Sequence, residues 1–207
     1  MRVVDMTLDP RRSQYEYFRT FANPYASMTV NCDITHLRRV TRERALPFFL
    51  TVLHCAVNAA NAVPELRRRI RGENVVEYER CISSHTVALP EETYCYCELD
   101  CSKPLAEFLP YALAEVERAK SCPTMEDGDE PDRLFFVSSV PWVSFASISL
   151  PKPVPADSNP RITFGKYFTQ GDRVLLPVDL TVNHALADGI HIAKFFEEFT
   201  RRTENLK

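Results

Sequence analysis

Alternating apolar and polar residues in the last third of the chain predict a series of strands. Four segments carry the β-branched and aromatic residues that suit a pleated, half-buried surface: residues 134–140, 143–150, 162–169 and 174–182. After them, from Asp188 to Arg202, apolar residues recur with the spacing of a helix. The chain is therefore expected to end with strands followed by one amphipathic helix.

The first two thirds of the chain mix the two patterns. The spacing of apolar residues predicts helices over residues 11–21, 36–42, 45–63 and 104–120, and strands over residues 25–33, 82–89 and 93–99. Asp9 and Pro10 suit the N-cap and the first position of the first helix. Residues 66–70 and 74–78 predict a hairpin, because Gly72 lies in the short segment between them.

These elements indicate an α+β fold with two layers, in which helices pack on one mixed β-sheet. Strands outnumber helices, and several strands follow one another directly. The sequence has no internal repeat and no flexible linker rich in glycine and serine, and only five glycines occur in the whole chain. Residues 1–207 are therefore expected to form a single domain with its own core.

Charge and hydropathy narrow the class of protein. The net charge of -3 and the pI of about 6.0 argue against a nucleic-acid binder, which would carry a basic domain. No stretch of about 18 apolar residues is present that could span a membrane. The first residues lack the apolar segment of a signal peptide, so a cytoplasmic location is expected.

The cysteines indicate free thiols. There are seven of them, an odd number, and no C-x-x-C pair occurs, which suits a reducing compartment. Cys95, Cys97 and Cys101 lie close together in the sequence, and His85 is expected on the neighbouring strand. Zinc sites generally need four convergent ligands, usually with cysteine pairs spaced C-x₂₋₄-C. The spacing here is C-x-C-x₃-C, which matches poorly, so no bound metal is expected.

The segment that most clearly suggests catalysis is residues 182–191, VNHALADGIH. His184 lies where a predicted strand ends, and Asp188 and Gly189 suit the start of the last helix. A neutral imidazole at such a position can take a proton from a hydroxyl group. The pattern also fits a polar strand end followed by an ordinary N-cap, because a motif this short occurs by chance.

Four blocks together decide between these readings. Residues 182–191 resemble the H-H-x-x-x-D-G signature of the chloramphenicol acetyltransferases, enzymes of antibiotic resistance whose signature the catalytic domains of 2-oxo acid dehydrogenase acyltransferases share. Residues 135–147 (FFVSSVPWVSFAS) resemble the family's F-V-S-x-x-P-W-V-x-F-x-S stretch, and residues 162–177 (ITFGKYFTQGDRVLLP) resemble T-M-x-K-Y-x-x-x-G-D-x-x-L-x-P. Near the start, Arg11 and residues 15–18 (YEYF) resemble R-x-x-H-F-E-x-F/Y. The order and the spacing of all four blocks agree.

The resemblance implies a catalytic role for each matching residue. His184 matches the general base that deprotonates the acceptor hydroxyl, which then attacks the acyl-CoA thioester without an acyl-enzyme. Ser147 matches the serine that stabilises the oxyanion, a contribution of about 3 kcal/mol for such a donor. Thr163 matches a threonine that acts through a bound water. Asp188 matches an aspartate that pairs with an arginine, here Arg11, and orders the turn around the base.

The resemblance also implies where the two substrates bind. Lys166 and Tyr167 match positions near the nucleotide of coenzyme A, where an ammonium suits a phosphate and a ring can stack on adenine. Phe18 matches an aromatic position in the acceptor pocket, which Tyr94 and Tyr96 are also expected to line.

Three positions depart from the family pattern. Asn183 replaces the first of the paired histidines, and Asp9 stands where a tryptophan is usual. The family's K-F-Y-P block appears only as Arg-Ala-Leu-Pro at residues 44–47.

The implied protein is an acyl-CoA-dependent O-acyltransferase that acetylates chloramphenicol with acetyl-CoA, needs no metal, and forms a homotrimer with active sites between subunits. Two alternatives remain open. One is an acyltransferase of the same fold with another small hydroxyl acceptor, and the other is a catalytically silent small-molecule binding protein. A lipoyl-linked acyltransferase is disfavoured because the chain has no lipoyl domain and no linker rich in proline and alanine.

Overall fold

The computed structural model describes residues 1–207 and is built around a seven-stranded mixed sheet. The strands lie in the order β2-β10-β8-β7-β5-β6, and β9 pairs with β10 beside this path. β5 and β8 run parallel to β7, and the other neighbours are antiparallel. In chain order, the strands are β2 (Tyr25–Asp33), β5 (Ile82–Ala88), β6 (Tyr94–Leu99), β7 (Leu134–Ser139), β8 (Arg161–Phe164), β9 (Phe168–Gln170) and β10 (Arg173–Asn183).

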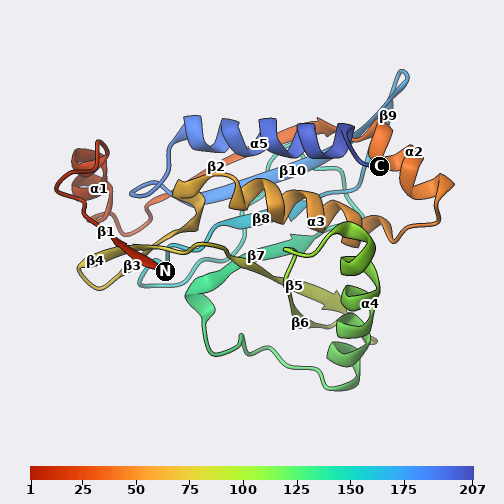
Figure 1. Cartoon of the computed structure of the whole chain (residues 1–207), viewed down its shortest axis with the longest axis horizontal. Coiled ribbons are helices and arrows are strands. Elements are labelled where there is room, and N and C mark those ends of the chain that lie inside the picture. Colours follow the sequence, from red (N-terminus) through yellow and green to blue (C-terminus); the bar gives the residue numbers. More distant parts are fainter.

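Helices pack on this sheet and around its edge (Figure 1). The longest are α3 (Phe48–Asn61), α4 (Leu105–Ser121) and α5 (Gly189–Glu204), and α2 (Thr35–Glu43) lies near the C-terminus of the chain. At the other end of the molecule, α1 (Arg12–Phe18) lies near a second, three-stranded sheet. That sheet consists of β1 (Arg2–Val4), β4 (Asn74–Glu77) and β3 (Arg68–Arg71), and short 3₁₀ turns span Pro64–Arg67 and Pro131–Arg133.

The side chains of β10, the strand next to β2 at one edge, show that one face of the sheet is apolar and the other polar. Val178, Leu180 and Val182 belong to the buried core that also contains Phe195 and Phe199 of α5. Successive side chains of a strand point to opposite faces, so the residues between these valines and leucine lie on the other side of the sheet. The apolar face therefore carries the helices and holds the main core.

The polar face of the sheet is organised around Asp179. This carboxylate is 3% exposed and accepts hydrogen bonds from Ser27, Thr29 and Thr181 at 2.8 to 3.0 Å. Thr163 is the cross-strand partner of Asp179 on β8, so it lies on the same face. A buried carboxylate with several hydroxyl donors is well compensated for its loss of water.

The predicted α+β class and its mixed sheet are confirmed, as are the strands at residues 25–33, 82–89 and 174–182. The strand predicted at residues 143–150 is wrong, because these residues form an irregular segment. Ser144 donates a hydrogen bond to the Lys166 carbonyl at 2.6 Å, and the backbone N–H of Lys166 donates to the Val143 carbonyl at 2.9 Å. The segment is thus bound to the chain that follows β8 rather than to a strand ladder.

Two predicted helices are shorter than expected. The first ends at Phe18 rather than at residue 21. The third begins at Phe48 rather than at residue 45, since Ala45 adopts a positive φ of 52° and Pro47 is extended. The single strand predicted over residues 162–169 is divided into β8 and β9.

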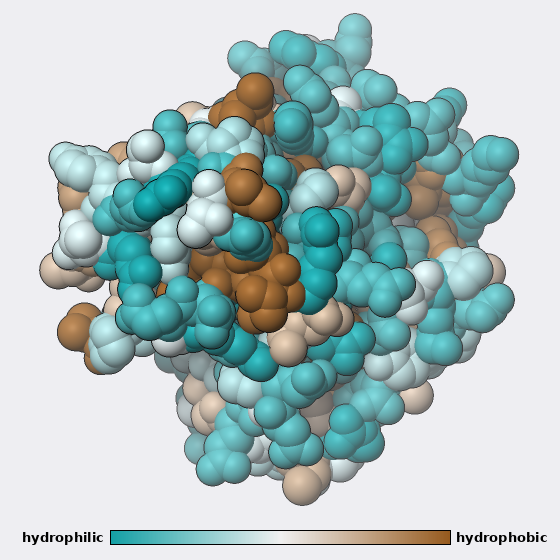
Figure 2. Space-filling view, turned by 60° about the vertical axis from the view of Figure 1, so that its left-hand side comes forward, coloured by the Kyte–Doolittle hydropathy of each residue, from teal (hydrophilic) through white to brown (hydrophobic).

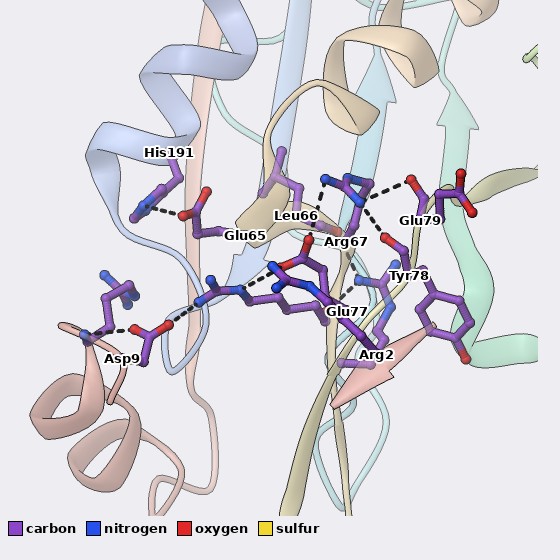
Figure 3. A network of polar contacts seen from close by, with 12 residues as sticks. Arg2, Asp9, Glu65, Leu66, Arg67, Glu77, Tyr78, Glu79 and His191 are labelled. Atoms are coloured by element: carbon purple, nitrogen blue, oxygen red, sulfur yellow. Dashed lines mark hydrogen bonds and ion pairs between the residues drawn. The ribbon is translucent and has the colours of Figure 1, made fainter. Parts of the chain in front are cut away.

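The basic run at residues 67–71 is partly buried. Arg69 is fully buried and donates to the carbonyls of Leu66 and Leu134 at 2.9 Å. Arg67 and Arg68 pair with Glu77, whose side chain is only 7% exposed (Figure 3). The run therefore ties the small sheet to the rest of the molecule.

None of the helices is both long enough and apolar enough to cross a lipid bilayer.

Candidate active site

Asn183 builds the turn that carries His184. Its backbone carbonyl accepts hydrogen bonds from the N–H groups of Leu186 and Ala187 at 3.0 and 3.1 Å. Its side-chain oxygen accepts from the N–H of Ala185 at 3.0 Å. This local bonding is typical of asparagine in turns. The replacement of the first motif histidine by Asn183 thus leaves a well-ordered turn at the end of β10.

The His184 imidazole is held in one tautomer. Nδ1 lies 3.1 Å from the Ala187 carbonyl oxygen and 3.1 Å from Oδ1 of Asp188. A carbonyl oxygen can only accept, so Nδ1 carries the proton and the neutral ring keeps the lone pair on Nε2. Phe18 stacks on the ring with centroids 4.1 Å apart. The side chain is 33% exposed, so Nε2 belongs to a ring that is both fixed and accessible.

Asp188 and Arg11 fix the other side of this turn. Nη1 of Arg11 pairs with the Asp188 carboxylate, and Nη2 donates to the His184 carbonyl at 3.1 Å. The Arg11 side chain is 11% exposed, and Arg11 precedes the first residue of α1. The contact therefore joins α1 to the start of α5. The pair that the resemblance implies is present in the structure.

The other four histidines are less suited to act as a base. Nε2 of His36 and Nε2 of His54 each contact a backbone carbonyl, at 2.8 and 2.9 Å. Burial lowers the pKa of His85 to about 4. His191 has its Nδ1 engaged by a backbone N–H. His184 alone combines an Nδ1–H bound to a carbonyl with an Nε2 that makes no hydrogen bond.

His191 supports the turn from inside α5. The N–H of Asp188 donates to its Nδ1 at 2.9 Å, and its Nε2 lies 3.7 Å from the Glu65 carboxylate (Figure 3). Burial lowers the pKa of His191, so the ring is neutral at pH 7 and can accept this hydrogen bond. His191 thus positions Asp188, which in turn contacts His184.

His191→Ala is expected to lower kcat about fivefold with little change in either KM, because losing one such hydrogen bond costs about 1 kcal/mol. His191→Gln should recover most of the activity, since glutamine at this helical position can also accept from the N-cap N–H. Steady-state kinetics of both variants give the measurement. Equal losses in the two variants would contradict a positioning role.

Ser147 and Thr163 lie on other parts of the structure. Ser147 is exposed in the irregular segment, outside any strand. Thr163 is 1% exposed on β8, beside Asp179 and opposite Ser138. Neither makes a hydrogen bond to His184. Within one chain, the structure therefore brings His184, Asp188, Arg11 and Phe18 into contact, and neither of these two hydroxyls makes a hydrogen bond to the group.

Lys166 and Tyr167 line a cavity of about 310 Å³ between the start of α3 and the end of β8. Its walls are mainly apolar and include Phe48, Phe49 and Val52. The rings of Phe48 and Tyr167 meet edge to face with centroids 5.4 Å apart. The cavity thus combines an aromatic wall with one ammonium group.

Gly165 allows the irregular segment to pack close to this cavity. A Cβ atom at this position would lie 2.9 Å from the Phe145 ring and 3.1 Å from the Pro177 side chain. Both distances are shorter than van der Waals contact, so only glycine fits without displacement of a neighbour. Phe145 is two residues before Ser147, and Gly165 therefore helps to place that serine.

Gly165→Ala is expected to destabilise the fold by about 1–3 kcal/mol through overpacking and to lower kcat. Adding Phe145→Leu, which shortens the opposing side chain, should restore part of both. Thermal unfolding and steady-state kinetics of the single and double variants provide the test. A single variant as stable and active as the wild type would disprove the close packing.

Tyr94 and Tyr96 line a second cavity of about 390 Å³ near the β5–β6 end of the sheet. Their ring centroids are 6.1 Å apart. The acidic segment at residues 125–132, which follows α4, reaches this cavity. There Asp127 accepts a hydrogen bond from Ser84 at 2.9 Å. The second cavity therefore has an aromatic wall, two carboxylates (Asp127 and Asp157) and the guanidinium of Arg161, and neither cavity includes His184 among its lining residues.

Comparison with known proteins gives consistent results. The family model described as chloramphenicol acetyltransferase matches residues 1–200. Chloramphenicol acetyltransferase 3 of Escherichia coli is 32% identical over 189 residues, covering 89% of this chain and 88% of that one. Chloramphenicol acetyltransferase 2 of Escherichia coli is 29% identical, covering 98% of this chain and 97% of that one.

Solved structures agree on the fold. A chloramphenicol acetyltransferase superposes with a TM-score of 0.86 at 21% identity, covering 97% of this chain and 98% of that one. A truncated catalytic core of the 2-oxoacid dehydrogenase multienzyme complex from Thermoplasma acidophilum gives a TM-score of 0.70 at 13% identity, covering 99% of each chain. The fold expected from the sequence motifs is therefore confirmed.

Proposed function

The chain belongs to the chloramphenicol acetyltransferase family, and on that premise we propose that it transfers the acetyl group of acetyl-CoA to a hydroxyl of chloramphenicol. The observation that carries the proposal is the state of His184. Its Nδ1–H is bound to the Ala187 carbonyl, and the ring is 33% exposed. Nε2 is then free to take a proton from a bound hydroxyl.

His184 acts as the general base. Nε2 removes the proton of the acceptor hydroxyl while the oxygen attacks the thioester carbonyl carbon, and the carbon–sulfur bond then breaks. The protonated imidazole returns the proton to the departing sulfur, so the products are an acetyl ester and the free thiol of coenzyme A. General base catalysis of this kind contributes about 10²- to 10⁴-fold to a rate.

Asp188 stabilises the protonated imidazole and keeps its orientation. One carboxylate oxygen lies 3.1 Å from Nδ1 of His184, and Arg11 holds the carboxylate in place. Ser147 donates a hydrogen bond to the oxyanion that forms on the carbonyl, and Thr163 supports it through a bound water. Donors placed where charge develops stabilise the transition state more than the ground state.

The two cavities suit the two substrates. The cavity beside Lys166 and Tyr167 takes acetyl-CoA, because its apolar walls suit the pantetheine arm and its ammonium and ring suit the nucleotide. The cavity beside Tyr94 and Tyr96 takes the acceptor, whose aromatic ring can pack on the tyrosines. Phe18 adds an apolar surface next to the base.

We further propose a cytoplasmic homotrimer in which each active site lies between two subunits. The separation of His184 from the residues that line both cavities supports this, since a second copy can bring them together. Figure 2 shows an apolar patch in a hollow ringed by hydrophilic residues on the side of the molecule that is turned forward. Phe21, Met28 and Ile190 are between 41% and 62% exposed, as suits residues that a partner covers.

An acceptor other than chloramphenicol has one observation in its favour. Asp127, Asp157 and Arg161 all line the second cavity, and Arg161 pairs with Asp157, so the Asp127 carboxylate is the one without a cationic partner. A small hydroxyl compound that carries a positive charge would be attracted to this group. Competition between such compounds and chloramphenicol for acetylation compares the two.

Mass spectrometry of chloramphenicol after incubation with the protein and acetyl-CoA tests the proposal. Appearance of the O-acetyl product, dependent on both the protein and acetyl-CoA, is the expected result. If chloramphenicol stayed unchanged while another hydroxyl compound was acetylated, that compound and not chloramphenicol would be the acceptor. No acetylated product from any hydroxyl compound would favour a silent binding protein.

A further inference from the structure

Asp9 is a nearly buried carboxylate at the entry to α1 (Figure 3). Its side chain is 8% exposed, and it stands where the family pattern has a tryptophan. Oδ1 accepts a hydrogen bond from the backbone N–H of Arg11 at 2.8 Å, and Oδ2 accepts one from Nη1 of Arg68 at 2.9 Å. A buried carboxylate needs such donors to offset its loss of water, so Asp9 is held between them. Asp9 therefore fixes the backbone of Arg11 just before the helix begins.

Arg68 connects Asp9 to the three-stranded sheet. Its side chain is 11% exposed, and its Nε lies 3.5 Å from the Glu77 carboxylate. Glu77 on β4 is opposite both Arg68 on β3 and Arg2 on β1, and Arg2 donates to it at 3.1 Å. Opposite charges in register on adjacent strands stabilise one another. The small sheet thus provides Asp9 with a cation whose position is fixed.

α1 has few other attachments to the rest of the molecule. The helix has seven residues, of which only Tyr15 is buried, and a helix this short is not stable by itself. The ion pair between Arg19, at its C-terminal end, and Glu73 is solvated, because the Glu73 side chain is 87% exposed. Exposed pairs of this kind contribute little to stability. The position of α1 therefore depends on the buried contact between Asp9 and Arg68.

α1 and its entry carry two groups that contact the catalytic turn. Arg11 pairs with Asp188 and donates to the His184 carbonyl at 3.1 Å. Phe18, at the other end of the helix, stacks on the His184 ring. Because the hydrogen bond made by one ring nitrogen sets the tautomer of a histidine, a displaced turn would release the proton from Nδ1 to either nitrogen. The order of contacts thus runs from Glu77 through Arg68, Asp9 and Arg11 to the base.

We propose that Asp9 and Arg68 are positioning residues for acetyl transfer. The pair fixes Arg11 and α1, and through them it keeps His184 oriented with its proton on Nδ1. The inference rests on the proposed function, since it takes His184 as the base. Neither residue belongs to the four motif blocks, and neither lines one of the two cavities. Their effect on catalysis is therefore indirect.

Two measurements on the same variants test the proposal. Steady-state kinetics with acetyl-CoA and chloramphenicol give kcat and both KM values, and ¹⁵N NMR of the histidine side chains gives the tautomer of His184. The variants are Asp9→Ala, Asp9→Asn, Arg68→Ala and the double variant Asp9→Ala/Arg68→Ala.

Two control variants separate positioning from a general loss of stability. Arg71→Ala removes another arginine of β3, whose partner is the half-exposed Asp132. Val57→Ala creates a cavity in the core on α3, away from this network, and should lower the temperature of unfolding. Both controls should keep the wild-type tautomer of His184.

Asp9→Ala is expected to lower kcat about tenfold with little change in either KM, because a slightly misplaced base loses rate and not substrate affinity. Part of the His184 population should move its proton to Nε2. Asp9→Asn should be intermediate, since its side-chain oxygen can still accept from the Arg11 N–H while the charge opposite Arg68 is lost. The double variant should lose no more than Asp9→Ala alone, because the two side chains act as one unit.

An unchanged kcat in Asp9→Ala and Arg68→Ala would overturn the inference. So would a lower kcat in these variants without a change in the tautomer of His184, or an equal loss in Val57→Ala. Each of these results leaves the proposed transferase activity intact. A wild-type protein without acetyl transfer would instead contradict the proposed function, and the tautomer comparison, which needs no activity, would still decide whether the pair orients His184.

Discussion

His184→Ala is expected to lower kcat for acetyl transfer by about 10²- to 10⁴-fold, the usual contribution of a general base. The variant removes Nε2, the one nitrogen that the bonding of Nδ1 leaves free for a proton. KM for either substrate should change little, because Phe18 and both cavities remain. Steady-state kinetics at saturating acetyl-CoA give the measurement.

Two controls accompany this variant. Its oligomeric state and thermal unfolding should match the wild type, which separates loss of chemistry from loss of fold. His36→Ala is the matched histidine control, because its Nε2 contacts the Leu206 carbonyl and not the site. If His184→Ala kept wild-type activity, His184 would not be the base.

Ser147→Ala is expected to lower kcat about a hundredfold, as the removal of one oxyanion donor typically does. Ser147 is exposed in the irregular segment and makes no hydrogen bond that holds the fold, so the loss should appear in kcat and not in stability. Ser149→Ala, an exposed serine in the same segment, is the control. A loss below about threefold would remove Ser147 from the mechanism.

Mixed trimers extend this experiment to the subunit arrangement. If His184 and Ser147 meet across an interface, trimers assembled from His184→Ala and Ser147→Ala subunits contain some sites with both residues intact. Co-expression of the two variants should therefore restore activity that neither shows alone. If both residues served the same site from one chain, no intact site would form and activity would stay low.

Periodicity predicted the sheet well because side-chain spacing reports burial directly. β2 and β10 are the two longest strands, and residues 25–33 and 174–182 were predicted as strands from their side-chain pattern. The error at residues 143–150 has a physical cause. Val143 and Ser144 bond to Lys166, more than 20 residues later, and Phe145 packs on Gly165. No local pattern reports such contacts.

Burial of charge was the other feature that the sequence could not show. Nothing in the sequence around Arg67, Arg68 and Arg69 indicates burial, yet partners from other strands cover them. Glu77 on β4 and the carbonyl of Leu134 on β7 complete the network (Figure 3). The sequence shows which charged residues are present, but only the fold determines which of them form ion pairs.

At the site, motif resemblance identified His184, Asp188 and Arg11, and these three lie in contact. The supporting roles of Asn183 and His191 depend on turn and helix geometry that the sequence does not specify. A capping-box signal, a hydrogen-bonding residue three positions after Asp188, could have pointed to His191.

The role of His184 in acetyl transfer is tested by thiol release from acetyl-CoA, measured with and without chloramphenicol on the wild type and His184→Ala side by side. Release by the wild type should require chloramphenicol and should be nearly absent in His184→Ala. Release that does not depend on an acceptor, or that persists in the variant, would contradict acetyl transfer through His184.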